Sequence, residues 1–261
     1  MKKHMDLLYK QVDGIDLYLD LYMPENVENP PLIMWIHGGA WMYGDRKSPG
    51  LMWQIDRGYA VASVEYRLTN QAIFPAHIID CKDALLYLKK NANKFGYNPN
   101  KMAVAGDSAG GHLAALMGTS CGHADWEPDG ADCTMQAIID FYGPTSLGEK
   151  WVGQLANDIG LSDRDSVRSQ LLGAYVLSKQ GKARAAVANP ITYIDGSEPP
   201  FLILHGDADD LVPYNQSVYL HDALIAAGVA VSLYRVHGGG HGFVRDDVDL
   251  VINEFLDFYL K

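Results

Sequence analysis

Short apolar runs of strand length recur along the chain, and helix-length segments lie between them. The segment Ile15–Tyr22 alternates with a period of two residues, which is typical of a half-buried strand. Later runs are short and mainly apolar, and the first of them is continuously so, as in strands that are buried on both faces of a parallel sheet. These runs are Leu32–Ile36, Tyr59–Val64, Met102–Ala105, Ala137–Phe141, Phe201–Leu204 and Val229–Val236.

Apolar residues are spaced by three and four positions in the segments between and after these runs. This spacing, which places them on one face of a helix, occurs in Ile78–Leu88, Val218–Ile225 and Val248–Tyr259. Alternating strands and helices predict right-handed crossovers and a mostly parallel sheet with helices on both faces. We therefore expect one α/β domain that spans residues 1–261.

The stretch 144–189 interrupts this alternation, because it contains no strand candidate. It includes helix-like pieces such as Ser162–Tyr175, where Ser162 and Asp165 resemble a capping box. We interpret the stretch as a small helical insertion that covers the carboxyl edge of the sheet as a lid. An ordinary crossover with two helices is the open alternative.

Composition and charge exclude several classes of protein. Hydrophobic residues make up 48% of the chain and charged residues 20%, which excludes wholesale disorder. The net charge of −11 would repel phosphate backbones, so we expect no nucleic-acid partner. The N-terminal residues are charged where a signal peptide needs an apolar stretch, and no apolar run is long enough to span a membrane.

Cysteine usage bears on the cellular compartment. Cys81, Cys121 and Cys133 are too few and too scattered for a disulfide framework, and they form no C-x-x-C pair. We expect them to be reduced and mostly buried, which fits a cytoplasmic protein.

The sequence Gly106-Asp107-Ser108-Ala109-Gly110 carries the strongest chemical signal. It follows an apolar run and precedes a good helix, so the G-x-S-x-G pattern has its required strand–turn–helix context. Small neighbours allow the sharp turn that presents a serine at the edge of a sheet. We predict that Ser108 is a nucleophile.

A serine nucleophile needs a base, and the base needs a carboxylate to orient it. Asp207, Asp209 and Asp210 lie in the loop after the run Phe201–Leu204, and by position alone the three are nearly equal candidates. His237 and His241 follow the last apolar run, where the base belongs in the chain order Ser, Asp, His.

The residues His37-Gly38-Gly39-Ala40-Trp41 directly follow the run Leu32–Ile36. Acyl transfer passes through a tetrahedral oxyanion that is stabilised by backbone N–H groups already aimed at it. We expect these donors on Gly38, Gly39 and Ala40, with the N–H of Ala109 as their partner.

Together these motifs resemble the α/β-hydrolase superfamily, in the branch of hormone-sensitive-lipase-like and feruloyl/acetyl-xylan-esterase-like carboxylesterases. The resemblance extends from Tyr9 to Phe258 and includes Tyr66-Arg67-Leu68. The family pattern H-G-x-x-D-x-x-V-P falls on His205–Pro213, and the resemblance thus implies Asp209 as the triad acid. Similarly, the pattern G-x-G-H-G-F implies His241 as the base. Ala40 stands where the hormone-sensitive-lipase-like motif usually has a third glycine.

Four other histidines close to these motifs are interpreted as structural. We expect His37 to brace the oxyanion loop, His112 to be a packed helix residue, and His205 and His237 to serve no proton transfer. A zinc site on His237 and His241 is disfavoured because the three glycines between them prevent the helix that such spacing needs. No phosphate-binding or dinucleotide-binding motif occurs, so we expect no cofactor and no metal.

The predicted function is hydrolysis of small-molecule esters with short acyl groups, through an acyl-enzyme on Ser108. Trp41, Tyr43 and Phe243 flank the motifs and are expected to line the substrate pocket. A kynurenine-formamidase-like amide hydrolase, which shares the H-G-G-x-W pattern, and a feruloyl/acetyl-xylan-type esterase are the alternatives. A non-catalytic protein of the same fold is the third class, and such proteins commonly lack a triad member.

Overall fold

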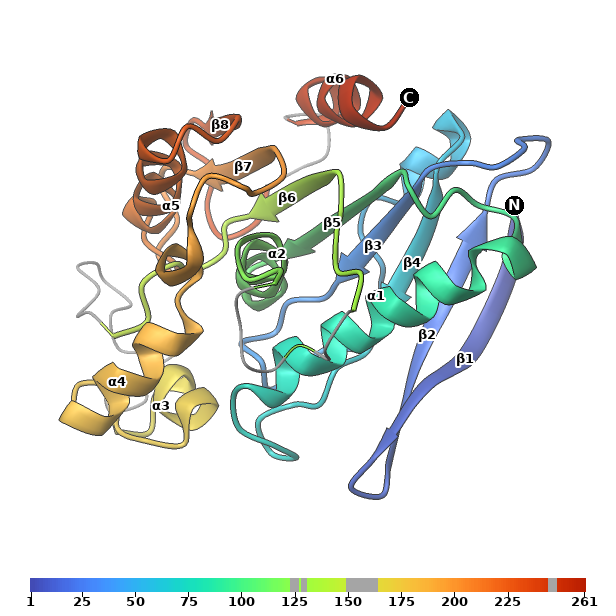
Figure 1. The fold of residues 1–261 in the computed structure, drawn as a ribbon. Helices are drawn as coiled ribbons and strands as arrows, with labels where there is room; N and C mark the ends of the chain where they lie inside the picture. Colours follow the sequence, from blue (N-terminus) through green and yellow to red (C-terminus); the bar gives the residue numbers. More distant parts are fainter. Residues whose placement is uncertain (123–126, 128–130, 149–163, 244–247) are drawn as a thin grey trace.

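The computed structural model describes residues 1–122, 127, 131–148, 164–243 and 248–261. In this part of the chain eight strands form a single sheet in the order β1-β2-β4-β3-β5-β6-β7-β8 (Figure 1). The strands are β1 Lys2–Val12, β2 Ile15–Met23, β3 Leu32–Ile36, β4 Ala60–Val64, β5 Met102–Asp107, β6 Ala137–Phe141, β7 Phe201–Gly206 and β8 Val231–Val236. The pairs β1/β2 and β2/β4 are antiparallel, and all others are parallel.

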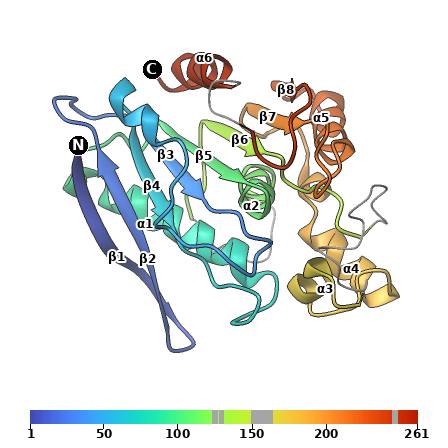
Figure 2. The same ribbon diagram turned by 180° about the vertical axis from the view of Figure 1, so that it is seen from behind.

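Helices cover both faces of the sheet, as the alternating pattern predicts. The helices α1, α2 and α5 lie on one face and α6 lies on the other (Figure 2). The helical elements are η1 Met52–Arg57, α1 Ala76–Phe95, α2 Ala109–Thr119, α3 Val167–Leu172, α4 Lys179–Ala188, η3 Pro190–Tyr193, α5 Asn215–Ala226 and α6 Asp249–Leu260.

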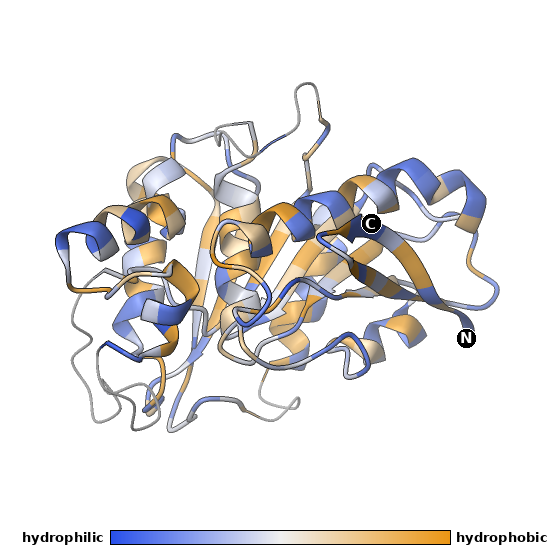
Figure 3. Ribbon diagram, turned by 90° about the horizontal axis from the view of Figure 1, so that it is seen from below, coloured by the Kyte–Doolittle hydropathy of each residue, from blue (hydrophilic) through white to orange (hydrophobic). Residues whose placement is uncertain are grey.

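Alternate residues of each central strand supply the two apolar layers. In β3, Met34 and Ile36 pack toward α1 and α2, whereas Ile33 and Trp35 pack toward α6. Successive side chains of a strand point to opposite faces, so a strand covered on both sides is largely apolar on both. Seen from below, the central strands are coloured mostly as hydrophobic, whereas the helices carry both hydrophobic and hydrophilic residues (Figure 3).

The edge strand β1 is absent from the elements that the sequence predicts. Its residues are mostly polar, and most of its side chains are exposed or half-buried. It pairs with β2 on one side only, and charged residues such as Lys2, Lys3 and Lys10 are typical of an exposed edge. A strand of this kind lacks the apolar pattern by which the buried strands are predicted.

Two short helices occupy the described part of 144–189. The helix predicted for Ser162–Tyr175 is shorter, since α3 begins after Ser166, whose hydroxyl accepts the N–H of Ser169 at 3.1 Å. The capping serine predicted at Ser162 lies outside the described residues. That this stretch acts as a lid stays a prediction.

The expectation of three reduced cysteines is wrong, because Cys121 and Cys133 form a disulfide while Cys81 is free and buried. Cys121 follows the end of α2 and Cys133 precedes β6, and α2 packs directly on β6. Tertiary packing thus brings together two cysteines whose spacing in the sequence does not indicate a disulfide. Disulfides persist mainly in oxidising compartments, so the cysteines no longer support a cytoplasmic location.

Reduction of this disulfide is expected to lower the free energy of unfolding by about 3 kcal/mol, the chain-entropy value for a loop of this size. Urea titrations with and without a reductant measure the change. The double variant Cys121→Ser/Cys133→Ser should unfold at the same urea concentration as the reduced protein, and the reductant should not change its midpoint. Equal unfolding midpoints for oxidised and reduced wild type would contradict the prediction.

Asp140 is a fully buried carboxylic acid in β6, beneath α2. Burial raises its pKa to about 6, although its Oδ1 accepts the N–H of Gly143 at 2.8 Å. A pKa above the unfolded value means that the folded state binds the proton more tightly. Its contribution to stability is therefore present at low pH and is lost as the pH rises toward 6.

We expect Asp140→Asn to gain stability relative to wild type as the pH rises. The difference between their unfolding free energies should grow by about 2–3 kcal/mol between pH 4 and pH 7. Urea titrations at several pH values measure this difference, and Asp222→Asn, at an exposed aspartate, controls for the lost charge. A difference that does not vary with pH would show that Asp140 does not titrate in this range.

No helix among the described residues is both long enough and apolar enough to cross a membrane.

Candidate active site

Ser108 lies in the sharp turn between β5 and α2. Its φ of 52° and ψ of −116° are strained values for a residue with a side chain. Its N–H donates to the carbonyl of Phe141 at 2.8 Å, and its carbonyl accepts the N–H of His112 at 3.0 Å. The turn is thus fixed by the neighbouring strand and by the first turn of the helix.

Glycines at two positions of the turn allow the strand and the helix to approach closely. A Cβ on Gly110 would lie 2.1 Å from the carbonyl oxygen of Ile36, and one on Gly106 would lie 2.4 Å from the carbonyl oxygen of Gly110. Both distances are far inside van der Waals contact with backbone atoms. Only glycine fits at these positions.

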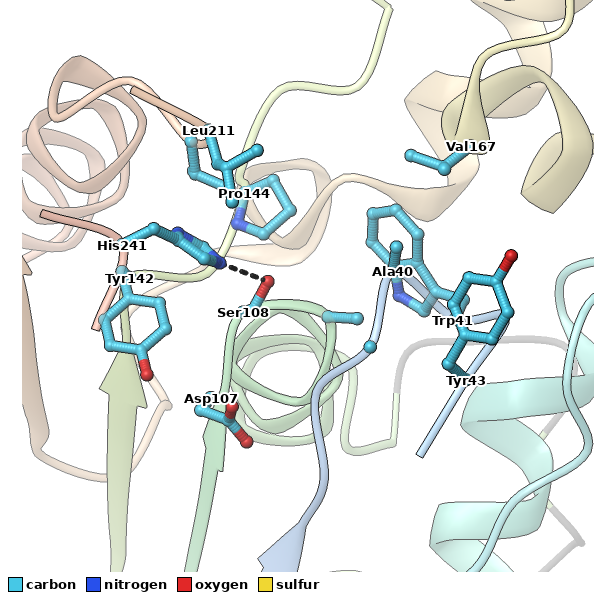
Figure 4. Close-up of a pocket in the computed structure, with 13 residues that line it drawn as sticks. Ala40, Trp41, Tyr43, Asp107, Ser108, Tyr142, Pro144, Val167, Leu211 and His241 are labelled. Carbon is cyan, nitrogen blue, oxygen red and sulfur yellow. Dashed lines mark hydrogen bonds between the residues drawn. The ribbon is translucent and has the colours of Figure 1, made fainter. Parts of the chain in front are cut away.

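The structure brings Ser108, His241 and Asp209 into one hydrogen-bonded chain. His241 Nε2 lies 3.0 Å from Ser108 Oγ (Figure 4), and His241 Nδ1 lies 2.8 Å from Asp209 Oδ2. A carboxylate only accepts hydrogen bonds, so Nδ1 carries the proton and Nε2 is left to accept from the serine hydroxyl. This is the tautomer that a general base requires.

Asp209 is held as a carboxylate by its surroundings. Burial favours the neutral acid, but hydrogen bonds from His205 and His241 outweigh it and hold the pKa of Asp209 well below its usual range. Its Oδ1 also accepts the N–H groups of Leu211 at 2.8 Å and Val212 at 2.9 Å. The side chain is fully buried, so these contacts fix its direction toward His241.

The competing acids and bases have other partners. Asp207 accepts hydrogen bonds from Arg235 and His237, and chiefly the bond from His237 lowers its pKa to about 2. The side chain of His237 is 91% exposed. Asp210 is exposed, and no hydrogen bond joins it to His241 among the interactions of the described residues.

His205 is buried beside Asp209, as expected of a structural histidine. Its Nε2 lies 3.1 Å from Asp209 Oδ2 and 2.9 Å from the carbonyl of Val212, while its Nδ1 lies 2.6 Å from Ser217 Oγ. The carboxylate of Asp209 is therefore shared between two histidines, of which only His241 reaches Ser108.

The loop after β3 turns beside Ser108 in left-handed backbone conformations. The φ values are 105° at Gly39, 54° at Ala40 and 59° at Trp41. The N–H groups of Met42 and Tyr43 both donate to the carbonyl of Gly39, at 3.0 and 2.9 Å, and they close the turn.

The expectation that Gly38 donates to an oxyanion is wrong. Its N–H already donates to Asp107 Oδ1 at 2.9 Å, because β3 and β5 are paired and end side by side. Gly38 instead permits close approach, since a Cβ there would lie 2.7 Å from Asp107 Oδ2. Gly39, Ala40 and Ala109 remain as candidate donors.

His37 stabilises the loop after β3 through contacts with Gly38 and Tyr66. Its Nδ1 lies 2.8 Å from the carbonyl of Gly38, and its ring stacks on Tyr66 with centroids 4.4 Å apart. Burial lowers the pKa of His37 and favours the neutral ring. The contact agrees with the bracing role expected from the sequence.

A cavity of about 370 Å³ opens above Ser108 and His241 (Figure 4). Trp41 and Tyr43 line it as expected, but the prediction for Phe243 is wrong. Phe243 instead contacts Tyr142, with ring centroids 5.4 Å apart, and lines a neighbouring cavity. Lining residues that the sequence analysis missed are Asp107, Tyr142, Pro144, Val167, Leu211 and Val212.

Position along the chain could have revealed some of these missed residues. Tyr142 directly follows β6 at the carboxyl edge of the sheet, and Leu211 and Val212 follow Asp209 in the same loop. Val167, by contrast, belongs to α3, and no local pattern in the sequence points to its place at the cavity.

Ligand atoms suited to a metal ion come together at one place among the described residues, formed by Cys121, Glu127 and Cys133. The two sulfur atoms there are joined in the disulfide, which removes the thiolates that bind metals. Glu127 is also paired with Lys82. His237 and His241 direct their Nδ1 atoms to different aspartates.

Comparison with known proteins identifies relatives of the chain. The model of the BD-FAE family matches residues 19–224. Esterase LipC of Mycobacterium tuberculosis is 30% identical over 82% of this chain and 53% of its own length, so the chain spans about half of that relative.

Solved structures give the same relationship. A truncated carbohydrate esterase from gut microbiota is 25% identical with a TM-score of 0.83, covering 99% of this chain and 96% of its own. Thermogutta terrifontis esterase 2 with bound propionate is 26% identical with a TM-score of 0.74, covering 96% and 90%. Because the family model matches most of its length, and because its sheet order and these neighbours agree, the chain belongs to the BD-FAE family and has the α/β-hydrolase fold.

Proposed function

We propose that the chain is a serine carboxylesterase that hydrolyses short-chain acyl esters through an acyl-enzyme on Ser108. The observation that carries the proposal is the unbroken path of hydrogen bonds from Ser108 through His241 to Asp209, which opens onto a cavity. The resemblance to Esterase LipC and to solved esterases supports the same reaction class.

The reaction proceeds in two halves. Ser108 Oγ attacks the ester carbonyl carbon while His241 Nε2 takes its proton, and the imidazolium is stabilised by Asp209. Collapse of the tetrahedral intermediate breaks the bond to the alcohol oxygen, which takes the proton from Nε2. Water, activated by the same nitrogen, then releases the acid and restores the serine.

The negative charge that develops on the carbonyl oxygen requires fixed donors. The N–H groups of Gly39, Ala40 and Ala109 are assigned this role, since the first two lie in the left-handed turn and the third begins α2 directly after Ser108. The N-terminus of α2 adds a favourable dipole at this point. Removal of such a donor costs about 10²–10³ in kcat in other hydrolases.

The geometry divides the cavity into two sides. The alcohol oxygen must receive its proton from His241, so the alcohol leaves on the side of His241, Tyr142 and Leu211. The acyl group then faces Ala40, Trp41 and Val167, which lie on the opposite side of Ser108 (Figure 4). Trp41 and the methyl group of Ala40 line that side.

We expect acetyl to butyryl esters to be the preferred substrates. The volume of about 370 Å³ is near the lower end for small-molecule pockets, and it must hold both halves of the ester. A series of p-nitrophenyl esters from acetate to palmitate gives kcat/KM for each acyl length. Ala40→Gly should extend the range by removing a methyl group. A maximum at octanoate or longer would contradict the short-acyl proposal.

Three alternatives are tested, two by changing the substrate and one by covalent labelling. Turnover of N-formylkynurenine in preference to p-nitrophenyl acetate would indicate a formamidase. Faster release of acetate or ferulate from xylan fragments than from p-nitrophenyl esters would indicate a feruloyl/acetyl-xylan-type esterase, a possibility favoured by the structural neighbour described as a carbohydrate esterase. Failure of a reactive organophosphate to label Ser108 would indicate a non-catalytic protein.

A further inference from the structure

We propose that His112 is a positioning residue for ester hydrolysis, which holds Trp41 and through it the turn that carries the oxyanion donors Gly39 and Ala40. This inference rests on the proposed function. It assigns a task in the reaction to a histidine that otherwise looks like a packed residue of α2.

His112 is fully buried and joins two other segments through its two ring nitrogens. The indole Nε1 of Trp41 lies 3.2 Å from His112 Nδ1, and the carbonyl oxygen of Ala188 lies 2.8 Å from His112 Nε2. An indole N–H only donates and a carbonyl only accepts, so Nδ1 accepts and Nε2 carries the proton. Burial lowers the pKa of His112 to about 4, which keeps the ring in this neutral form.

Trp41 is the part of the oxyanion loop on which this contact acts. Ala40 and Trp41 are consecutive residues with φ values of 54° and 59°, a conformation that residues with side chains disfavour. Such a turn persists only where its surroundings hold it. The carbonyl of Trp41 accepts the N–H of Thr69 at 2.9 Å, and its indole donates to His112, so the residue is held at both ends.

The position of His112 in α2 links its hydrogen bond with Trp41 to the nucleophile. The N–H of His112 donates to the carbonyl of Ser108 at 3.0 Å, so the residue lies one helical turn beyond the nucleophile. Its side chain reaches the oxyanion loop on one side and the last residue of α4 on the other. One residue therefore sets the loop donors relative to the serine.

The expected effect falls on kcat more than on KM. The donors of Gly39 and Ala40 act most strongly when negative charge develops on the substrate oxygen, which occurs in the transition state. Loosening the turn therefore lowers the rate of the chemical step. A histidine needed only for packing would affect stability and leave kcat per folded enzyme unchanged.

Three variants at position 112 separate the two contacts. Asparagine places an acceptor where Nδ1 lies and keeps the bond to Trp41, glutamine places a donor where Nε2 lies and keeps the bond to Ala188, and leucine keeps neither. We expect kcat to fall about tenfold in His112→Leu and His112→Gln, and by less than about threefold in His112→Asn. KM should change little in all three.

The measurement uses p-nitrophenyl acetate, with kcat expressed per site titrated by diethyl p-nitrophenyl phosphate, so that misfolded protein is not counted. Met117→Ala, at a buried residue further along α2, is the control for lost stability and should keep its kcat per titrated site. Trp41→Phe removes the same hydrogen bond from the other side and should lower kcat like His112→Leu. Trp41→Phe serves as the test if His112→Leu does not fold.

Equal kcat values in the asparagine and glutamine variants would overturn the inference, as would a loss confined to KM. A wild-type protein that is neither labelled by the phosphate ester nor active on p-nitrophenyl acetate would instead overturn the proposed function. The two failures are thereby distinguishable.

Discussion

Replacing Ser108 by alanine is expected to lower kcat by about 10⁶-fold, the scale of loss when the serine of such a triad is removed. Its Oγ lies 3.0 Å from His241 Nε2, and it is the atom that we assign to attack the ester carbonyl. Without it, residual turnover depends on water and on the oxyanion donors. Steady-state kinetics with p-nitrophenyl acetate measure the loss.

Stability provides the control for this variant. Alanine keeps the backbone hydrogen bonds of the turn, to Phe141 and His112, because these use main-chain atoms. The unfolding midpoint should therefore stay close to that of wild type, and labelling by an organophosphate should disappear. Retention of a tenth of the wild-type activity would refute Ser108 as the nucleophile.

The buried strands could be predicted from the sequence because each is largely apolar on both faces. The run Leu32–Ile36 matches β3 as observed, and Ala137–Phe141 matches β6. Strand β1 could not be predicted in this way, since only one of its edges is paired and its side chains are largely solvated. The disulfide was missed for a different reason, because it depends on how α2 packs against β6.

In the candidate site, the backbone motifs could be located from the sequence, whereas the contacts of individual groups could not. The strand–turn–helix context located Ser108 because the turn needs Gly106 and Gly110 for close contact. The engagement of Gly38 by Asp107 depends on the pairing of β3 with β5, and the place of Phe243 depends on its packing against Tyr142 at the end of β6. Neither is visible in residue spacing.

Asp209→Asn is expected to lower kcat by about 10⁴-fold, and His241→Ala by about as much as the loss of the serine. The asparagine amide can donate to His241 Nδ1, which moves the ring proton to Nε2. That nitrogen can then no longer accept the proton of Ser108. Because Oδ1 of the asparagine can still accept the N–H groups of Leu211 and Val212, the loop should stay folded.

Asp207→Asn is the matched control, since Asp207 lies in the same loop but pairs with Arg235 and His237 near the surface. We expect its kcat to fall less than about tenfold, because neither partner reaches Ser108. Kinetics of both variants on p-nitrophenyl acetate make the comparison. A large loss at Asp207 with activity retained at Asp209 would reverse the assignment, and it would require His241 to be oriented by a different carboxylate. The full burial of Asp209 and its two histidine contacts argue against that outcome.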